Sequence, residues 1–326
     1  MKKLFIKLAK TLGYEIIDQN NFVSPTLEKE LNDDLSEFNK SSIVLPLGEV
    51  KITRKIKSLL IIFRTNTSIE IWDQNKKRLF EFPKIEYATR SLNSLIKSIK
   101  YLKQKFSKID VKLIILDDNS NKENLELIKK ISKHEKNSEI ISLDHNKYKS
   151  LIKEQKSHET FSNLSSLLNS FEIGKDRGED LVFFVEDDYL HFETMLEEML
   201  SSFQRVSSQL NKDIFMCPSD YPYLYMNNEK TNILIGNRRH WRTIDKTLCT
   251  FLTSKKLINQ YWINFKKTCE ERHYPFEKHL NEIYKKEICL SPLKSLSLHL
   301  TNVNSSYGLA PFIDYKNLWE ENKIQD

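Results

Sequence analysis

Glycine is scarce in this sequence, with only six in 326 residues. None of them builds a G-x-G-x-x-G or a G-x-x-x-x-G-K-[ST] pattern, which excludes a glycine-rich phosphate loop of either kind. If the chain binds a nucleotide, its phosphate charge must be met another way, and a metal held by carboxylates is the obvious candidate. The glycines are Gly13, Gly48, Gly174, Gly178, Gly236 and Gly308.

Cysteines are few, and long apolar runs are missing. The four cysteines are widely spaced without a C-x-x-C pair, which argues against a zinc knot and fits thiols kept reduced. No run of about 18 apolar residues occurs, so we expect no transmembrane helix. The lysine-interrupted N-terminal stretch has no small-residue cleavage site after it, so we expect no secretory signal and a cytoplasmic location.

The charge is moderately basic, with a net charge of +6, and 39% of residues are hydrophobic, enough for a packed core. A basic excess suits nucleic acid, anionic lipid or a phosphorylated substrate. The excess here is lysine-rich and lacks an aromatic-interleaved basic motif, so we expect no nucleic-acid partner.

Residues 1–55 read as a helix followed by an irregular polar arm. Lys2 to Leu12 has the spacing of an amphipathic helix, in which Leu4, Phe5, Leu8 and Leu12 share one face and Lys3, Lys7 and Lys10 lie largely elsewhere. Such a helix either lies on an anionic membrane surface, with residues 1–14 in contact with the inner face, or docks on its own domain. The sequence leaves both open.

From residue 56 onward, apolar runs alternate with helical patterns. Four strands are predicted at Ser58–Phe63, Val111–Leu116, Glu139–Leu143 and Leu181–Val185. Helices are predicted between and after them at Lys84–Lys108, Asn121–Ser132, His158–Phe171 and Glu193–Val206. This order indicates an α/β fold with a mainly parallel central sheet flanked by helices. Later elements are less regular: strands at Ile214–Cys217 and Thr247–Thr253, and helices at Lys255–Lys267 and Phe276–Lys286.

Charged residues follow these strands, at the edge where ligands bind in open α/β sheets. Arg64 follows the first, Asp117-Asp118 the second, Asp144 the third and Glu186-Asp187-Asp188 the fourth. Converging carboxylates are costly without a cation, and Mg²⁺ or Mn²⁺ binds one or two carboxylates together with substrate phosphates. Glu186 and Asp188 face the same side if the chain stays extended. The alternative is an acidic helix N-terminus.

With these motifs in place, the chain resembles the GT-A glycosyltransferases, particularly the inverting family-two group. Asp117-Asp118-Asn119-Ser120 resembles the family's DD-x-S, and Glu186-Asp187-Asp188 its D-x-D. The resemblance implies a Rossmann-like nucleotide-diphospho-sugar transferase fold in residues 56–326, with the donor part in 56–190 and the acceptor part in 191–326. It also implies donor contacts from Arg64, Asp117, Asp118, Asn163 and Asp187.

The same resemblance implies a metal site and a general base. Glu186, Asp188 and His299 would hold Mn²⁺ or Mg²⁺, although the motif begins with Glu rather than Asp. An inverting transfer needs a base on the acceptor hydroxyl. Glu277 lies in the family's window for that base, and Pro275 suits the first position of the helix that follows. Glu270, Glu271 and Asp245 are rivals for this role.

Two aromatic and basic stretches are expected to line the donor sugar and the acceptor. The residues predicted to bind substrate are Asp220, Tyr221, Arg239, His240 and Trp241. Arginine pairs with phosphate in a bidentate manner, and aromatic faces bind sugars. The competing interpretation places the aromatic side chains in the core.

These features predict a metal-dependent glycosyltransferase. It would move a sugar from a UDP- or GDP-sugar to a glycan or lipid-linked acceptor in surface glycan synthesis. One alternative is a sugar-phosphate nucleotidyltransferase, which normally shows a glycine- and arginine-rich phosphate loop. The other is a non-catalytic carbohydrate- or membrane-binding protein on a degenerate transferase scaffold, against which the carboxylates at three strand ends argue.

Overall fold

The computed structural model describes residues 2–14, 38–39, 41–44, 48–68, 79–154, 157–226, 230–301, 303 and 305–324. The chain divides into two compact units, Met1–Asp34 and Leu35–Asp326. The first unit contains helix α1 (Lys2–Thr11), close to the helix predicted from the sequence. Among the described residues, no helix has both the length and the apolar character needed to cross a membrane.

The second unit is built around a nine-stranded sheet with the order β5-β4-β3-β6-β11-β8-β12-β10-β9. Its strands are β3 (Ser58–Thr65), β4 (Asp110–Asp117), β5 (Ser138–Ser142), β6 (Leu181–Glu186), β8 (Phe215–Met216), β9 (Ile233–Ile235), β10 (His240–Ile244), β11 (Phe251–Ser254) and β12 (Cys289–Pro292). The first four strands of the order, which include the longest ones, pair in parallel. Beyond β6 the sheet is mostly antiparallel.

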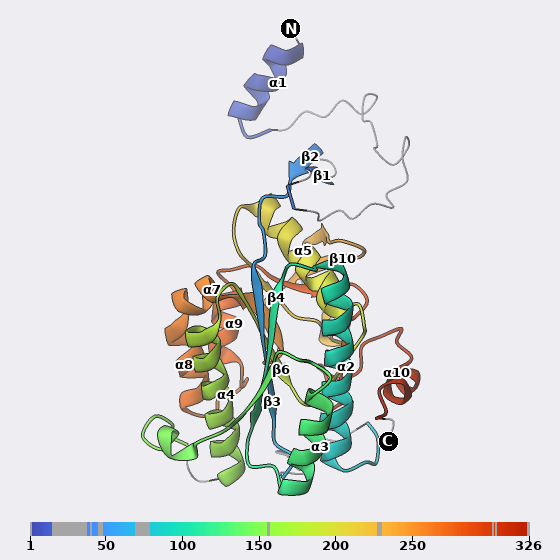
Figure 1. Ribbon diagram of the computed structural model, residues 1–326. Coiled ribbons are helices and arrows are strands. Elements are labelled where there is room, and N and C mark those ends of the chain that lie inside the picture. The colour runs from blue at the N-terminus through green and yellow to red at the C-terminus, as the bar shows by residue number, and fades with distance from the viewer. Residues whose placement is uncertain are drawn as a thin grey trace. The chain divides into compact units, whose positions relative to one another are not determined.

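Helices cover both faces of this sheet (Figure 1). One face packs against α2 (Lys84–Lys105), α3 (Lys122–Ser132) and α5 (Met195–Leu210). The other packs against α4 (His158–Arg177), α7 (Lys255–Gln260), α8 (Trp262–Glu270) and α9 (Lys278–Tyr284). Successive side chains of a strand point to opposite faces, so Phe183 belongs to the first core and its neighbour Phe184 to the second. The predicted α/β class, a central sheet flanked by helices, is confirmed.

The strand order fixes where a ligand would bind. The chain runs outward from β3 to β4 and β5, then crosses back to β6 on the other side of β3. This makes the gap between the carboxyl ends of β3 and β6 a topological switch point, where open α/β sheets bind ligands. Arg64 and Glu186 are paired in register at these two strand ends.

Short elements complete the second unit. Strands β1 (Ser41–Val44) and β2 (Gly48–Lys51) form an antiparallel hairpin in a stretch expected to be irregular. Strands β7 (Tyr189–His191) and β13 (Ser297–His299) form a second antiparallel pair. The remaining helices are η3 (His145–Tyr148), α6 (Tyr223–Met226) and α10 (Tyr315–Glu321).

Several predicted boundaries need correction. The helix expected over Lys255–Lys267 is two helices, α7 and α8, because the chain turns at Tyr261. The helix expected from Phe276 begins at Lys278, since a hydrogen-bonded turn from Lys278 N to Pro275 O comes first. Pro275 therefore precedes the helix instead of opening it.

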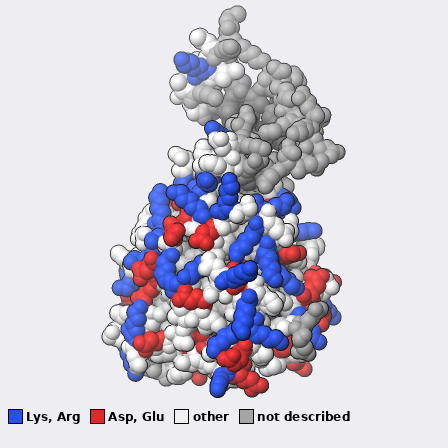
Figure 2. All heavy atoms as spheres, viewed as in Figure 1, with Lys and Arg blue, Asp and Glu red and all other residues white. Residues whose placement is uncertain are grey.

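Charges of both signs share the surface of the molecule. On the face shown in Figure 2, Lys and Arg side chains lie among Asp and Glu side chains. Exposed ion pairs of the molecule include Arg177 with Glu139 at 2.5 Å and Lys129 with Glu126 at 2.8 Å. Such mixing is typical of a solvated surface.

Candidate functional site

The carboxyl ends of β3, β4 and β6 bring the predicted donor-side residues together. Arg64 at the end of β3 donates from Nη1 to Asn163 Oδ1 at 2.5 Å and from Nη2 to Glu186 Oε1 at 2.8 Å. Asn163 comes from α4, which crosses the sheet behind these strands. Thr250, just before β11, donates to the other Glu186 oxygen at 3.3 Å. Arg64, Asn163 and Glu186 thus form one hydrogen-bonded group.

Asp187 is held by the protein on both of its carboxylate oxygens. Its Oδ2 accepts from Thr65 Oγ1 at 2.8 Å and from Asn66 N at 3.2 Å. Its Oδ1 lies 3.0 Å from Lys84 Nζ at the start of α2. Asp187 is buried and joins the end of β3 to the first turn of α2. Asp187 therefore holds the carboxyl end of β3 and the start of α2 together.

Asp188 and His299 meet although they are distant in sequence. The antiparallel register of β7 and β13 sets His299 opposite Tyr189, next to Asp188. Asp188 Oδ2 then lies 3.2 Å from His299 Nε2. The other ring nitrogen, Nδ1, lies 2.9 Å from the carbonyl oxygen of Tyr307, and the ring stacks on Tyr189 at 4.9 Å between centroids. Both the tilt and the position of the imidazole are therefore fixed.

Each member of this pair favours the charged form of the other. Burial opposes ionisation of Asp188, yet the charge and hydrogen bond of His299 hold the pKa of Asp188 well below its usual value. Burial would likewise lower the pKa of His299, but the Asp188 carboxylate raises it above its ordinary value. Opposite charges at this distance reinforce one another most where water is largely excluded.

The metal site predicted from Glu186, Asp188 and His299 is assembled only in part. When His299 is neutral and Nδ1–H donates to the Tyr307 carbonyl, the lone pair of Nε2 faces Asp188, and this nitrogen and the carboxylate oxygen are a donor set suited to Mn²⁺. Glu186 turns instead toward Arg64 and Thr250, because β6 ends at Glu186 and a turn takes residues 187–188. Over the described residues, no group of three His, Cys, Asp or Glu side chains forms a ready cage. The pair fits a metal that takes its remaining ligands from a bound phosphate and water.

At the end of β4, the Asp117-Asp118 pair is almost fully buried. Asp117 Oδ2 accepts from Ser120 N at 3.3 Å, and its Oδ1 has no hydrogen-bond partner in the described part of the chain. Burial raises the pKa of Asp117, and the nearby charges of Asp118 and Asp187 act in the same direction. A buried carboxylate oxygen without a partner is costly unless a ligand or water satisfies it.

Asp118 anchors a histidine that the sequence analysis did not assign. Asp118 Oδ1 lies 2.6 Å from His145 Nε2, and Asp118 Oδ2 accepts from Ser162 Oγ of α4. From this hydrogen bond we assign the Nε2 hydrogen of His145 to the Asp118 side. Asn119 Nδ2 lies 3.1 Å from the same ring nitrogen. Asp118 thus orients the imidazole, and because Nε2 donates to Asp118, the Asn119 amide nitrogen lies close to Nε2 without donating to it.

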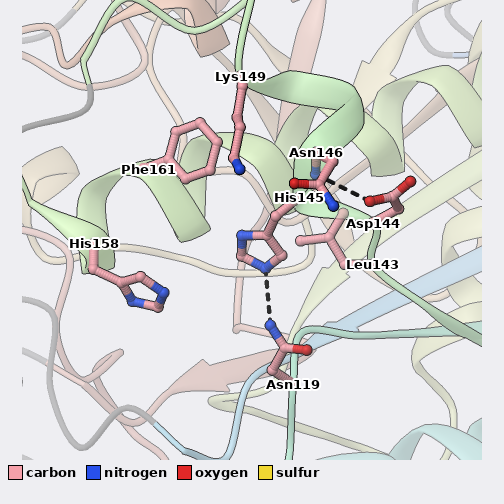
Figure 3. A pocket seen from close by; sticks show the side chains of 8 residues that line it. All are labelled: Asn119, Leu143, Asp144, His145, Asn146, Lys149, His158 and Phe161. Carbon is pink, nitrogen blue, oxygen red and sulfur yellow. Dashed lines mark hydrogen bonds between the residues drawn. The ribbon is translucent and has the colours of Figure 1, made fainter.

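A hollow of about 690 Å³ opens beside His145 at the carboxyl ends of β4 and β5 (Figure 3). The His145 and His158 rings are nearly parallel, with 10° between their planes and 6.1 Å between centroids. The Phe161 ring lies 5.9 Å from His145. The residues that line the hollow are Asn119, Leu143, Asp144, His145, Asn146, Lys149, His158 and Phe161. Flat rings beside polar groups suit a planar heterocycle.

Glu277, the predicted base, lies at the N-cap of α9 and is half-buried. The buried Cys249 thiol lies within electrostatic range of Glu277. Burial raises the pKa of Cys249 first, and the charges of Glu186 and Glu277 raise it further while Arg64 opposes them. Glu277, Glu186 and Arg64 therefore all act electrostatically on the same buried thiol.

Two of the predicted substrate residues are engaged inside the protein. Asp220 forms a buried ion pair with Arg242 and accepts from Tyr225 Oη at 2.5 Å. Tyr221 is 1% exposed, and its hydroxyl lies 2.7 Å from that of Tyr189. Tyr189 in turn stacks on His299. Tyr221 therefore supports the Asp188–His299 pair from behind and does not face a substrate.

The second aromatic stretch behaves differently from what the sequence suggests. Trp241 is fully buried, with its Nε1 3.4 Å from Glu198 Oε1 on α5. It sits so close that a Cβ at Gly236 would come within 2.4 Å of the indole. Arg239 donates to the carbonyl oxygen of Lys294 at 2.7 Å, while His240 is exposed at the start of β10. The stretch forms the β9–β10 turn and most of β10, in which Arg238, Arg239 and His240 reach the surface while Trp241 and Arg242 are buried.

Sequence reasoning missed the residues that build the hollow and the back of the site. Asn119 and His145 stand in strand-end segments, and that position is a usable signal. Lys84, Ser162 and Thr250 carry no signal, because they reach the edge from elements whose placement depends on packing.

Comparison with known proteins gives likenesses of fold only. No family model matches the sequence. No curated protein matches it either. Solved structures with a similar course of the chain include galactosyltransferase LgtC in complex with donor and acceptor sugar analogs, at 11% identity and a TM-score of 0.35, covering 71% of this chain and 72% of that one. UDP-glucose pyrophosphorylase from Acinetobacter baumannii matches at 10% identity and a TM-score of 0.38, covering 82% of this chain and 92% of that one.

A third similar structure is GalNAc-T7 with UDP, GalNAc and Mn²⁺, at 10% identity and a TM-score of 0.42, covering 80% of this chain and 46% of that one. With TM-scores below 0.5, these likenesses do not assign an activity to this chain. The residues at the strand edge have to carry that argument.

Proposed function

We propose that this chain is a metal-dependent glycosyltransferase of the GT-A type, acting on a UDP- or GDP-sugar with inversion as in the family-two enzymes. The observation that carries the proposal is the meeting of Asp188 and His299, 3.2 Å apart at the switch-point edge. An oxygen and a nitrogen ligand there, beside Arg64, suit a metal-bound diphosphate. If His299 had only a structural role, it would not need to contact Asp188, the last carboxylate of Glu186-Asp187-Asp188.

The donor would lie along the carboxyl edge from β5 to β6. Its base would enter the hollow next to His145, and Asp117 and Asp118 would face the nucleoside. Strands lie about 4.8 Å apart, so β4 and β6 are separated by roughly 10 Å. Arg64 and Asn163, on and behind the intervening strand, are placed to contact the diphosphate.

Asp188 and His299 are the residues that would hold Mn²⁺ or Mg²⁺, with Glu186 acting through Arg64. The metal, when bound, offsets the charge that develops on the departing diphosphate. Arg64 and Lys84 add fixed positive charge on the same edge, each already oriented by a carboxylate. Because the Arg64 and Lys84 side chains are already oriented, they need not reorganise during the reaction, as water molecules would.

Glu277 is the proposed general base. Glu277 is half-buried at the start of α9, and its charge acts on the same buried Cys249 thiol as the charges of Arg64 and Glu186. It would accept the proton of the acceptor hydroxyl as that oxygen attacks the anomeric carbon and the bond to the diphosphate breaks. Arg239 and His240 remain candidates for the acceptor side, on the turn that opens toward the same edge.

The wider role we propose is surface glycan synthesis in the cytoplasm, with a glycan or lipid-linked acceptor. Residues 56–190 would form the donor part and residues 191–326 the acceptor part. The donor-side contacts described above come from the first part, except that Thr250 of the second part donates to Glu186. Asp188 and His299 join the two, since they come from either side of that boundary.

Donor hydrolysis tests this function without knowledge of the acceptor. The chain is incubated with a panel of UDP- and GDP-sugars in Mn²⁺, in Mg²⁺ and in EDTA, and the released nucleoside diphosphate is measured. We expect metal-dependent release from one donor. Release that EDTA leaves unchanged would contradict the metal assignment.

The same reactions separate the alternatives. Incubation with UTP or GTP and a sugar 1-phosphate, followed by measurement of pyrophosphate, would reveal a nucleotidyltransferase. No turnover in either assay, and no thermal shift with any nucleotide, would favour a non-catalytic scaffold.

A further inference from the structure

Helix α1 in the first unit carries a one-sided apolar surface. Four large apolar side chains along it are between 59% and 77% exposed: Leu4, Phe5, Leu8 and Leu12. At 100° per residue they fall within an arc of roughly 100°. Four adjacent exposed apolar side chains of this size mark an interaction surface.

The sequence of α1 is also basic. It contains four lysines, Lys2, Lys3, Lys7 and Lys10, of which the exposed Lys7 lies about 100° around the helix from Leu8. Residues 1–14 contain no Asp or Glu, and α1 has no acidic residue in its first turn. A short helix with an apolar stripe and an unopposed positive charge is complementary to a surface that is apolar inside and negatively charged outside.

From this juxtaposition we propose that α1 is a docking helix for an anionic lipid surface, lying in the plane of the membrane. Leu4, Phe5, Leu8 and Leu12 would enter the acyl boundary, and the lysines would meet the lipid phosphates. The helix has 10 residues and is roughly 15 Å long, too short to cross the apolar core. The exposed Tyr14 just beyond it suits the membrane–water boundary, where tyrosine is enriched. This inference does not rest on the proposed activity.

Lipid headgroups are favoured over the other occupants because of the charge. A second copy of α1 would bring the positive charges of two basic helices close together, which is unfavourable. An anionic membrane attracts each lysine by about 1 kcal/mol, equivalent to a roughly fivefold gain in binding. The attraction falls as salt screens the charges.

Co-sedimentation of the full chain with vesicles tests the proposal. One set of vesicles contains equal parts of phosphatidylglycerol and phosphatidylcholine, and the other contains phosphatidylcholine alone. We expect sedimentation with the anionic vesicles, weakened by added salt, and little with the neutral ones. A chain that stays in the supernatant with both, or binds both equally, would overturn the proposal.

Matched variants locate the surface. Leu8→Glu should weaken vesicle binding roughly tenfold or more. The leucine side chain that would be buried in the acyl boundary is lost, and a negative charge is added. Ile263→Glu makes a similar change at a residue of α8 that is 69% exposed and should leave binding unchanged. Lys7→Gln should cost roughly fivefold, and Lys256→Gln on α7 should cost nothing.

Two further results would replace lipid with another occupant. A dimer in the absence of vesicles that Leu8→Glu converts to a monomer would assign the surface to a second copy. Lower thermal stability of the Leu8→Glu chain, without vesicle binding by the parent, would assign it to the protein's own second unit. Both readouts are independent of transfer activity.

Discussion

Asp188 Oδ2 and His299 Nε2 lie 3.2 Å apart across 111 residues of sequence. The contact exists because β7 and β13 pair with Tyr189 opposite His299. It places a carboxylate oxygen and an imidazole nitrogen just beyond the end of β6, at the switch point of the sheet. The proposed activity depends on this pair more than on any other feature.

Replacing either member of the pair should abolish transfer while the fold persists. We expect Asp188→Asn and His299→Gln each to lower the rate roughly 100-fold or more, since both remove a proposed metal ligand. Asp176→Asn changes an exposed aspartate and should keep full activity. Initial rates of donor hydrolysis check this. Near-normal rates in Asp188→Asn would contradict it.

Arg64 and Glu186 should be energetically coupled. Their side chains are only 11% and 27% exposed, so water screens the pair weakly. A double-mutant cycle with Arg64→Gln and Glu186→Gln should give a coupling free energy of about 1 kcal/mol in urea unfolding. The exposed pair Lys129 and Glu126 should give less than about 0.5 kcal/mol by the same measurement. Equal coupling in both pairs would show that the Arg64 pair has no special role.

Trp241 should matter for stability and not for the donor. It is fully buried against Gly236 and Glu198, so Trp241→Ala should cost about 3–5 kcal/mol of unfolding free energy. Tyr274→Ala removes an aromatic side chain that is 79% exposed and should change stability by less than about 0.5 kcal/mol. A Trp241→Phe variant should keep the KM for the donor. A raised KM in a stable Trp241→Phe protein would restore its predicted role at the substrate.

His145 should contribute to nucleotide binding. We expect His145→Gln to raise the Kd for the nucleotide roughly tenfold, because one oriented hydrogen-bonding ring is lost from the hollow. His134→Gln alters an exposed histidine at the end of α3 and serves as the control. Calorimetric titration with UDP and GDP measures both. An unchanged Kd would place the base elsewhere.

Glu198 should make stability depend on pH. Burial raises the pKa of Glu198 above its ordinary value of 4.5, although its hydrogen bonds oppose the change. The folded state then binds more protons than the unfolded state as pH rises from that value, so the free energy of unfolding falls. Glu198→Gln removes this loss, and the variant should gain stability relative to the parent as pH rises above 4.5. A stability difference that does not change with pH would refute the assignment.

The sequence carries enough information for the four parallel strands and the helices between them. Runs such as Ser58–Phe63 are apolar throughout because both faces of the strand are covered, and that pattern is local. The strand-end positions of Arg64, Asp118 and Asp188 follow directly. The part of the site formed by strand-end residues can therefore be predicted from the sequence, because the carboxyl ends of parallel strands lie at the same edge of the sheet.

The remaining half depends on contacts that no local pattern encodes. Glu186 was expected to face the metal with Asp188, but the turn at Asp187 breaks the alternation and Arg64 takes the carboxylate. Trp241 lies among charged residues in the sequence, and that pattern predicts a loop. Its burial comes from α5 and from the space that Gly236 leaves.

Calorimetric titration of the matching nucleoside diphosphate tests the central claim most directly. The wild-type chain and Asp188→Asn would each be titrated in Mn²⁺ and in EDTA. The account predicts binding to the wild type in Mn²⁺ that EDTA weakens and that Asp188→Asn loses. Equal binding in all four titrations would contradict a metal–nucleotide site at Asp188 and His299.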